Sequence, residues 1–418
     1  MGGTLSRVTS LLLATTILLV GHGLQLTLLP LHALSIGWSG TAIAWTGSFY
    51  YLGFLTGCML LPGTVAAIGH IRSFMVMAAI ATAALLAAGL WAHAGAWLLF
   101  RFGSGIALSG LYMVIESWLT EVSPKAQKGR ILSVYLVLSL AGMAVGQLLI
   151  ATGSAGDLRL FVIGALLISI AIVPVGLTRV AHPSPIPNAR FNTKALLDAS
   201  RVAVVCVLLA GMVVGGFWIL GPVVAGGYGL ESASVGLLMS VGIAGGALAQ
   251  LPVGRFSDST DRRLVIASVS AAGVLACLFG LFFAGSSTVA LFTSFLLLGA
   301  AAMPLYGLCI ALASDHSGLS LVEIASGMLL AHSAGSIVGP LLISPLIGAR
   351  PGSFFVYAGV CFGVAAAWAT YRYLFVERPE VLEPPPSMLP RTTQAVTGLI
   401  DAERPAQALP ANDGESGS

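Results

Sequence analysis

Charged residues are scarce in this sequence. They make up 8% of its 418 residues, and hydrophobic residues make up 57%, whereas soluble domains carry about 25% charged residues. Apolar runs of the length that a helix needs to cross a bilayer recur along the chain. Because backbone polar groups inside lipid must bond within the chain, such runs form helices. The composition excludes a soluble fold and predicts an all-α polytopic membrane protein.

Signatures of enzymes and of metal sites are also missing. The five cysteines are odd in number and include no C-x-x-C pair, so they predict neither disulfides nor a metal site. No H-E-x-x-H stretch and no phosphate-binding G-x-x-x-x-G-K-[ST] loop occurs. AHSAG at 331–335 resembles a nucleophile elbow, but it lies in an apolar helical run instead of a strand-to-helix turn. We expect no enzymatic activity, no bound cofactor and, since the basic residues are dispersed, no nucleic-acid partner.

Twelve apolar runs predict twelve transmembrane helices. The first run is too long for the apolar region of a cleaved signal peptide, so we expect it to remain as the first span. Glycine and proline inside the runs are tolerated in membrane helices and do not divide them. The approximate bounds are 8–33, 41–67, 73–92, 96–120, 131–152, 158–178, 202–225, 231–255, 263–285, 288–313, 321–348 and 353–375.

The distribution of Lys and Arg predicts the orientation of the chain. With a cytoplasmic N-terminus, the cytoplasmic segments hold 16 of the 19 basic residues, and only Arg101, Arg159 and Arg350 lie at or near the other side. Basic residues favour the cytoplasmic side of a membrane. We therefore expect a multi-pass protein of the bacterial inner membrane with both termini in the cytoplasm.

The two halves of the sequence resemble each other. AGMAVGQLLI at 141–150 and AGSIVGPLLI at 334–343 are identical at seven of ten positions, with an offset of 193. A second match, at an offset of 190, pairs Leu61, Pro62 and Arg72 with Leu251, Pro252 and Arg262. Chance similarity between apolar segments is the alternative. Since both matches relate spans that are six apart, we expect two parallel-repeat six-helix bundles.

The boundaries of these bundles follow from a change in composition. AHPSPIPNARFNTK, after the sixth run, is polar and Pro-rich, which is typical of a linker. We expect an N-terminal bundle at 1–178, a cytoplasmic linker at 179–201, a C-terminal bundle at 202–375 and a cytoplasmic tail at 376–418. The tail is rich in Pro, Glu, Ser and Gly, which predicts disorder.

Five of the 35 charged residues gather in GRFSDSTDRR, between the eighth and ninth runs. This segment resembles the signature G-x-x-x-D-x-x-G-R-[RK] of the major facilitator superfamily: Gly254, Asp258, Arg262 and Arg263 match, and Asp261 replaces the second glycine. The corresponding first-half segment, PGTVAAIGHIR, is degraded. The resemblance implies a conformational latch, in which Asp258 binds a helix N-terminus or a facing arginine in one state only. A solvated positive-inside loop is the alternative.

The fourth run carries a second resemblance to this superfamily. RFGSGIA, from Arg101, is similar to its fourth-helix motif of an arginine followed by small residues. An arginine within a span indicates a functional site, unless its side chain snorkels to the nearby interface. At about 100° per residue, Arg101, Tyr112 and, more loosely, Glu116 share one helix face. We expect this face to line a central cavity.

Two stretches resemble a narrower group, the YcaD-like facilitators: GHIRSF at 69–74 and GLYMVIESWLTEVSPKAQKGRILSVYLVLSLAGMAVGQLL at 110–149. Members of that group are mostly of unassigned substrate, so the resemblance implies the fold more than the function. The Gly-Pro pair of proton antiporters is replaced by Gly146-Gln147 in the fifth run, whereas the eleventh keeps Gly339-Pro340. The resemblance to antiporters is therefore partial.

Few other polar residues lie inside the runs. His22 and Gln25 share one face of the first run, and His332 lies near the middle of the eleventh. Histidine titrates near neutral pH, so either His could carry a coupling proton; the alternative is a neutral His bonded to a neighbouring helix. Glu116 is either an interfacial acid or one partner of an ion pair at a cytoplasmic gate.

The sequence and its resemblance together predict a secondary active transporter that works by alternating access. We expect proton-coupled export of a small amphipathic or drug-like solute, because the expected cavity walls are apolar. The alternatives are uptake of a small metabolite and a membrane sensor or assembly protein that no longer transports. The expected partners are the lipid bilayer and a small-molecule substrate, the expected driving force is the proton gradient, and the expected state is a monomer.

Overall fold

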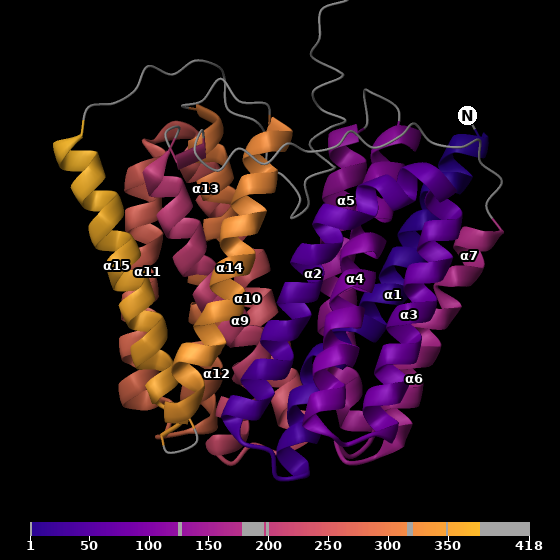
Figure 1. Cartoon of the computed structure of the whole chain (residues 1–418). Helices are drawn as coiled ribbons and strands as arrows, with labels where there is room; N and C mark the ends of the chain where they lie inside the picture. The colour runs from indigo at the N-terminus through magenta and orange to yellow at the C-terminus, as the bar shows by residue number, and fades with distance from the viewer. Residues whose placement is uncertain are drawn as a thin grey trace, which may run out of the picture.

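The chain folds into long helices that run side by side (Figure 1). A computed structural model describes residues 2–123, 128–177, 196–197, 200–315, 321–347 and 350–376, and these residues contain no strand. The elements are α1 (Gly2–Ser35), α2 (Gly40–Ile68), α3 (His70–Leu90), α4 (Ala94–Val122), α5 (Lys128–Leu148), η2 (Leu149–Thr152), α6 (Leu158–Ile170), α7 (Ile172–Gly176), α9 (Arg201–Gly227), α10 (Ser232–Ser259), α11 (Arg262–Phe283), α12 (Thr288–Ala302), α13 (Pro304–Asp315), α14 (Leu321–Ile347) and α15 (Ser353–Phe375).

The described helices form twelve segments long and apolar enough to cross a membrane, which confirms the predicted all-α polytopic fold. Three spans combine two elements: α5 with η2, α6 with α7, and α12 with α13. The tenth span is interrupted at Met303, and Pro304 begins α13. The first position of a helix suits proline, because its missing N–H would have no partner there.

Apolar side chains cover the outside of the helices. Leu99 of α4 is 70% exposed, and Leu248 of α10 is 72% exposed. Many other large apolar residues share this outward position. An apolar exterior of this extent would be unfavourable in water, but it matches the hydrocarbon core of a bilayer.

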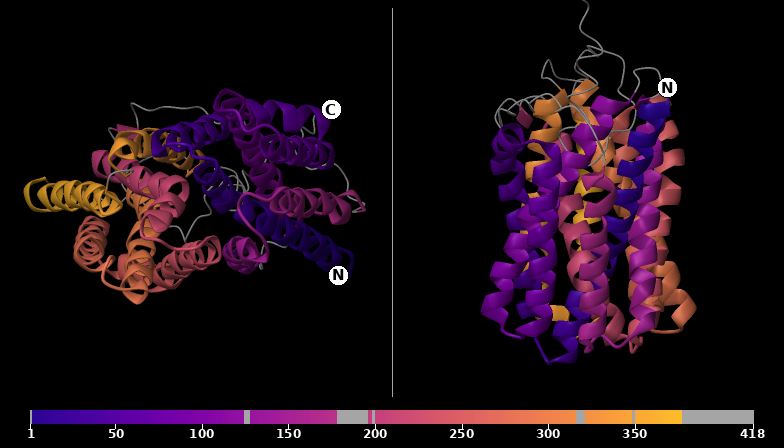
Figure 2. Two further views of the ribbon diagram at one scale, coloured as in Figure 1. Left: turned by 90° about the horizontal axis from the view of Figure 1, so that it is seen from below. Right: turned by 90° about the vertical axis from the view of Figure 1, so that its right-hand side faces the viewer.

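The two halves of the sequence occupy the two sides of the molecule. Helices α1–α7 lie on the right of Figure 1 and α9–α15 on the left, and a view from below shows the same separation (Figure 2). The predicted linker at 179–201 and tail at 376–418 lie outside the described residues, except for 196–197, 200–201 and 376. The division into bundles, linker and tail at the expected bounds stays a prediction.

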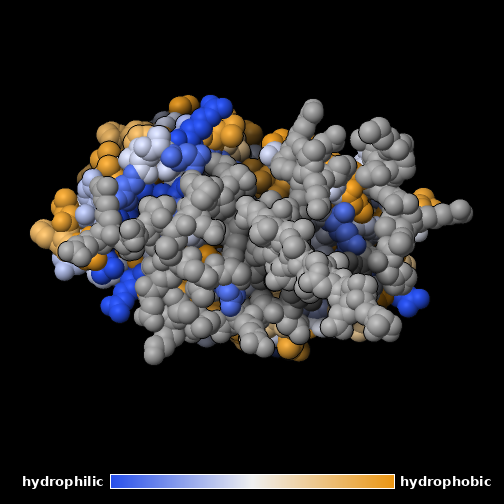
Figure 3. Space-filling view, turned by 90° about the horizontal axis from the view of Figure 1, so that it is seen from above, coloured by the Kyte–Doolittle hydropathy of each residue, from blue (hydrophilic) through white to orange (hydrophobic). Residues whose placement is uncertain are grey.

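Both ends of the described chain lie at one end of the helices (Figure 1). We call this end, where α1 begins and α15 ends, the N-terminal face, and we call the other end the opposite face. From the N-terminal face, hydrophilic side chains are seen to gather over the half that holds α11 and α15 (Figure 3).

Glycines allow the same pairs of helices to approach closely in both halves. A β-carbon at Gly53 of α2 would lie 2.0 Å from the carbonyl oxygen of Phe102 of α4. A β-carbon at Gly245 of α10 would lie 2.1 Å from the carbonyl oxygen of Leu296 of α12. These positions correspond, because 245 − 53 is 192 and 296 − 102 is 194. Only glycine permits either contact, so the halves repeat a helix packing as well as a sequence.

The longest sequence match has the same structural basis. Gly146 of α5 packs against the backbone of Val20 of α1, and Gly339 of α14 packs against the backbone of Met212 of α9. The offsets are 193 for the glycines (339 − 146) and 192 for their partners (212 − 20). The fifth span therefore lies on the first as the eleventh lies on the seventh, which is the arrangement expected of a parallel repeat.

Candidate functional site

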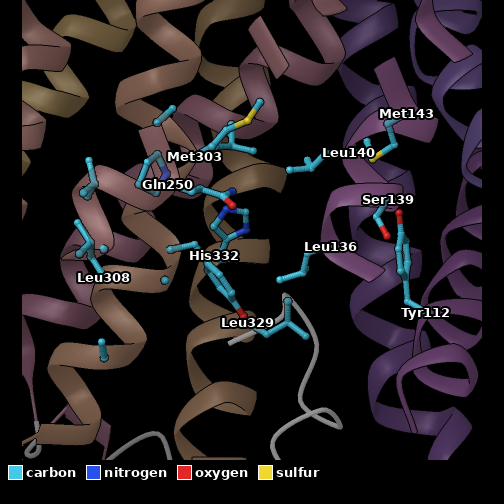
Figure 4. Close-up of a pocket in the computed structure, with 18 of the residues that line it drawn as sticks. Tyr112, Leu136, Ser139, Leu140, Met143, Gln250, Met303, Leu308, Leu329 and His332 are labelled. Carbon is cyan, nitrogen blue, oxygen red and sulfur yellow. The ribbon is translucent and has the colours of Figure 1, made fainter. Parts of the chain in front are cut away.

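A cavity of about 380 Å³ lies between the two halves of the molecule. Its wall includes residues of α1, α2, α4 and α5 from the first half and of α9, α10, α13 and α14 from the second. Figure 4 shows Tyr112 and Met143 on one side of this space and Met303 and His332 on the other. Cavities of this size accommodate small-molecule ligands.

The cavity opens at the N-terminal face and is closed toward the opposite face. Its wall extends to Arg255 and Asp258, which are exposed near the N-terminal face. Toward the opposite face, α2 packs against α14 and α5 packs against α10. A β-carbon at Gly236 of α10 would lie only 2.3 Å from the carbonyl oxygen of Gln147 of the fifth span. The backbones touch there, so they leave no path for a solute.

Two serines join the halves at the closed end. The hydroxyl of Ser48 of α2 donates to the carbonyl oxygen of Ile337 of α14 at 2.7 Å. The hydroxyl of Ser240 of α10 lies 3.0 Å from two acceptors, the carbonyl oxygen of Ala144 of α5 and that of Gly236 in its own helix. The positions correspond across the repeat, because 240 − 48 is 192 and 337 − 144 is 193. Each half therefore contributes the same donor and the same acceptor, and we call this arrangement the serine pair.

Nine aromatic or sulfur-containing side chains line the wall. Rings supply a large apolar contact area with a polar edge or hydroxyl, and methionine adapts its shape to irregular ligands. Such a wall suits a solute with an apolar body and a few polar groups. The residues are Tyr50, Tyr51, Phe54, Tyr112, Tyr135, Met143, Trp218, Met303 and Tyr306.

Glu116 is the buried acid of this wall. Among the described residues that line the cavity, Glu116 and Asp258 are acidic; Glu116 is 1% exposed, whereas the Asp258 side chain is 67% exposed near the cavity mouth. The hydroxyl of Tyr135 donates to Oε1 of Glu116 at 2.9 Å, while Oε2 has no described hydrogen-bond partner. No basic side chain pairs with Glu116 among the described residues, so the expected gate ion pair is not formed in this structure. The second carboxyl oxygen can therefore hold a proton without losing a described hydrogen bond.

His22 lies among tyrosine rings. Its Nε2 is 3.5 Å from the hydroxyl of Tyr50, and its ring lies edge-on to Tyr112 with the centroids 6.3 Å apart. Its Nδ1 and the Oε1 of Gln25 are both buried without a described hydrogen-bond partner. His22 lines the cavity and Gln25 does not. On the other wall, His332 packs edge-on against Tyr306, with the ring centroids 5.1 Å apart.

Arg101 is buried instead of reaching the nearby interface. Its side chain is 6% exposed, and its guanidinium carbon lies 4.5 Å from the centre of the Tyr50 ring. Snorkelling to the interface is therefore wrong for this structure. Contact with an aromatic face contributes up to about 2 kcal/mol when both groups are desolvated, whereas removing an ion from water costs several kcal/mol. Tyr50 alone does not compensate for the burial of Arg101.

The charged segment forms a network at the N-terminal face. Arg262 Nε donates to Oδ2 of Asp315, the last residue of α13, at 2.6 Å, and Nη1 donates to the Ser257 hydroxyl at 2.6 Å. Arg263 pairs with Asp261 at 3.0 Å and also donates to the carbonyl oxygen of Arg372 in the last turn of α15. The network ties α11 to α13 and α15 within the second half.

The structure adds two details about this segment. Gly254 and Asp258 lie in the last turns of α10, and Arg262 and Arg263 begin α11, so only two residues connect the helices. Arg262 makes the contact with another helix, because it pairs with Asp315 of α13. Asp258 is largely exposed, and its partner, at 3.6 Å, is Arg262. Asp261 accepts from the backbone N–H of Arg263 as the N-cap of α11, which explains an acid in place of the signature's glycine.

The comparisons with known proteins agree with this geometry. The model of the Major Facilitator Superfamily matches residues 11–328 and also residues 203–408. The chain belongs to this superfamily. It is a membrane transporter, not an enzyme. The two matches overlap, and one of them covers the second half alone.

Related proteins within the superfamily include two with the same name, "Uncharacterized MFS-type transporter YcaD". The protein of Escherichia coli O139:H28 (strain E24377A / ETEC) is 28% identical over 351 residues, which are 82% of this chain and 90% of that protein. The protein of Salmonella arizonae (strain ATCC BAA-731 / CDC346-86 / RSK2980) is 27% identical over 350 residues, with the same coverage. The predicted YcaD-like resemblance is confirmed.

Two solved superfamily structures share the fold. The nucleoside transporter NupG has a TM-score of 0.68 at 17% identity and covers 89% of this chain and 100% of its own. The D-xylose-proton symporter has a TM-score of 0.65 at 14% identity and covers 90% of this chain and 97% of its own. Similarity at this level of identity concerns the fold alone.

Three residues of the site were not predicted from the sequence. Tyr135 meets Glu116 from another span, and no pattern in the sequence pairs them. Ser257 bonds Arg262 although it has no position in the superfamily signature. Asp315 could have been predicted, because it ends an apolar run at the same side of the membrane as the basic segment.

The serine pair predicts a shift between conformations. Hydrogen bonds between membrane helices contribute about 0.6 kcal/mol each, so Ser48→Ala with Ser240→Ala should weaken the closed end by about 1.2 kcal/mol, or roughly eightfold in population. A cysteine replacing Leu26, which lines the cavity, should then react faster with a membrane-impermeant maleimide added at the opposite face. Ser268→Ala is the control, because that hydroxyl bonds only the carbonyl of Leu264 in its own helix. Equal labelling rates in the double variant and the control would contradict the role of the serine pair.

We propose that the signature segment acts as a latch together with Asp315, and that Asp258 and Asp315 have different roles. Asp315→Asn should lower the free energy of unfolding by about 3 kcal/mol, because it leaves the buried Arg262 with only the exposed Asp258, at 3.6 Å, as a charged partner. Asp258→Asn should leave that free energy unchanged but slow transport, since an exposed acid contributes little to stability and is free to pair in another state. Thermal unfolding and the flux of a transported probe at equal protein levels separate the two effects. If Asp258→Asn transports at the normal rate, Asp258 has no latch function.

Proposed function

We propose that the protein exports small amphipathic solutes in exchange for protons. The observation that carries this proposal is the buried Glu116 in a cavity whose wall is otherwise largely aromatic and apolar. Rings and methionines bind apolar bodies of varied shape, and the free oxygen of Glu116 offers one point of charge or hydrogen bonding. A wall of this kind favours varied solutes over one polar metabolite.

Glu116 also suits the role of proton carrier in this proposal. A carboxyl group with one oxygen held by Tyr135 and the other without a described partner can gain or lose a proton without breaking an ion pair. His22 lies deeper, beside Tyr50, and is the candidate for a second proton site. His332 and Tyr112 line the same space and are candidates for solute contact. Arg101 and Gln25 lie outside the wall of this cavity.

Uptake of a small metabolite is the second candidate. The tyrosine hydroxyls and the Trp218 ring of the wall offer hydrogen bonds and stacking that a sugar or a nucleoside could use. The fold neighbours named above include a nucleoside transporter and a D-xylose-proton symporter. Glu116 is compatible with proton coupling in either direction, so the direction of transport is decided by experiment.

We further propose that the N-terminal face is cytoplasmic, in the inner membrane of a bacterium. A reporter that is active only outside the cytoplasm should be active when inserted within 153–157, at the opposite face, and silent when fused after residue 190 or at the C-terminus. The reason is the bias of Lys and Arg toward the cytoplasmic side. Reporter activity at the C-terminus would overturn both the orientation and the direction of the open cavity.

Glu116→Gln tests the export proposal. Glutamine keeps the size and one acceptor but cannot release a proton, so inverted membrane vesicles with this variant should lose most of their proton-driven uptake of ethidium, by a factor of roughly 100 or more, as expected for loss of an essential proton group. Exchange of ethidium down its own gradient should persist. The matched control is Glu121→Gln, since Glu121 lies on the same helix but is exposed. Undiminished proton-driven uptake by Glu116→Gln would refute proton coupling at Glu116. If vesicles with the unmodified protein accumulate no dye from a panel of amphipathic dyes, the export proposal is wrong.

A further inference from the structure

Arg372 lies near the end of α15 without an acidic partner. The residue is in the last turn of this helix, at the N-terminal face, and it is half-buried. None of the ion pairs among the described residues includes it. The carbonyl oxygens of Arg372 and Val376, at the negative end of the helix, already accept hydrogen bonds from Arg263. The positive charge of Arg372 therefore has no counter-charge of its own among the described residues.

The two terminal nitrogens of this guanidinium are accessible from outside the protein. Nε of Arg372 is buried without a described hydrogen-bond partner, whereas Nη1 and Nη2 are not buried. The guanidinium carbon lies 6.0 Å from the centre of the Trp368 ring, about one turn earlier on α15. The side chain therefore extends back along the helix, toward the membrane. Its terminal nitrogens form a planar fork that matches two oxygens of a phosphate group.

Aromatic and apolar side chains accompany Arg372 on the last turns of α15. The rings of Trp368 and Tyr371 are stacked with their centroids 6.0 Å apart, and those of Tyr371 and Phe375 lie 5.4 Å apart. Phe375 is 73% exposed, and Leu374 is 63% exposed. The helix lies at the outer edge of its half (Figures 1 and 2), where lipid surrounds the protein. Aromatic residues at the end of a span lie at the level of the lipid headgroups.

We propose that Arg372 binds the phosphate of an anionic phospholipid. Two phosphate oxygens accept from the terminal nitrogens of the guanidinium, while the acyl chains cover Leu374 and Phe375. A zwitterionic lipid carries its own positive group beside the phosphate, whereas an anionic lipid also supplies the counter-charge that Arg372 lacks. Inorganic phosphate would supply the charge but would leave the apolar side chains uncovered. The site lies on the outer surface, so it does not depend on the direction of transport or on the role of Glu116.

Fluorescence quenching at the end of α15 tests this site. Leu374→Cys, labelled with bimane, places a reporter near Arg372, and Cys58→Ser removes the one native cysteine that is not buried. The protein is reconstituted in phosphatidylcholine vesicles that contain either brominated phosphatidylglycerol or brominated phosphatidylcholine as the quencher. Brominated phosphatidylglycerol should quench at a roughly fivefold lower mole fraction, as expected for one basic residue that faces an anionic headgroup. Equal quenching by the two lipids would overturn the proposal.

Two variants separate Arg372 from the general attraction of anionic lipid to a basic face. Arg372→Gln should remove the preference for phosphatidylglycerol, whereas Arg255→Gln should keep it, because Arg255 is exposed at the same face but lies at the cavity mouth. An equal preference in both variants would refute the role of Arg372.

If Arg372→Gln does not fold, competition by inorganic phosphate gives a second measurement on the labelled protein. Sodium phosphate, replacing sodium chloride at constant ionic strength, should leave the preference unchanged, because the ligand is a lipid whose acyl chains also contact the protein. Loss of the preference in phosphate would show that the site binds the free ion and would equally overturn the proposal.

Discussion

Close contact between the halves at the opposite face is the constraint on which the rest of the structure depends. Ser48 and Ser240 each donate to a backbone carbonyl of the other half, and Gly236 lets α10 touch the backbone of the fifth span. Because these helices meet at one end only, they diverge toward the other and leave the large cavity between them (Figure 1). The cavity is therefore a consequence of where the two halves are joined.

The repeat makes this junction reversible in principle. The two halves contribute equivalent donors and acceptors, at offsets of 192 and 193 residues, so neither half has to be remodelled for the junction to open. Glycine also allows close backbone contacts inside each half, such as Gly53 with Phe102 and Gly245 with Leu296. Tight packing within halves and a few hydrogen bonds between them are what rigid-body rocking requires.

Charge is distributed according to the same geometry. The ion pairs of the described residues lie at the N-terminal face, where Arg262 and Arg263 are buried and Asp258 is exposed. Within the membrane, Glu116 and Arg101 are buried on one helix, fifteen residues apart (116 − 101), or about 22 Å along its axis. This separation is too large for them to neutralise each other, so each must find its partner elsewhere. Ionisable residues buried at two depths within the membrane are typical of a substrate or ion pathway.

The sequence by itself determined the membrane class, the number of spans and the kinship of the halves, because these follow from run length and from residues that recur at a fixed offset. It also identified His22, Tyr112, Glu116 and His332, since a polar or aromatic residue in an apolar run is conspicuous. Only the tertiary structure decided which of the candidate residues line the same cavity. Gln25 and Arg101, which the sequence also indicated, do not line the large cavity. Helix periodicity predicts the face of the helix on which a residue lies, but it does not predict which neighbouring helix packs against that face. That information depends on the packing of all twelve spans, which is why Tyr135 emerged as the partner of Glu116 only once the helices were in place.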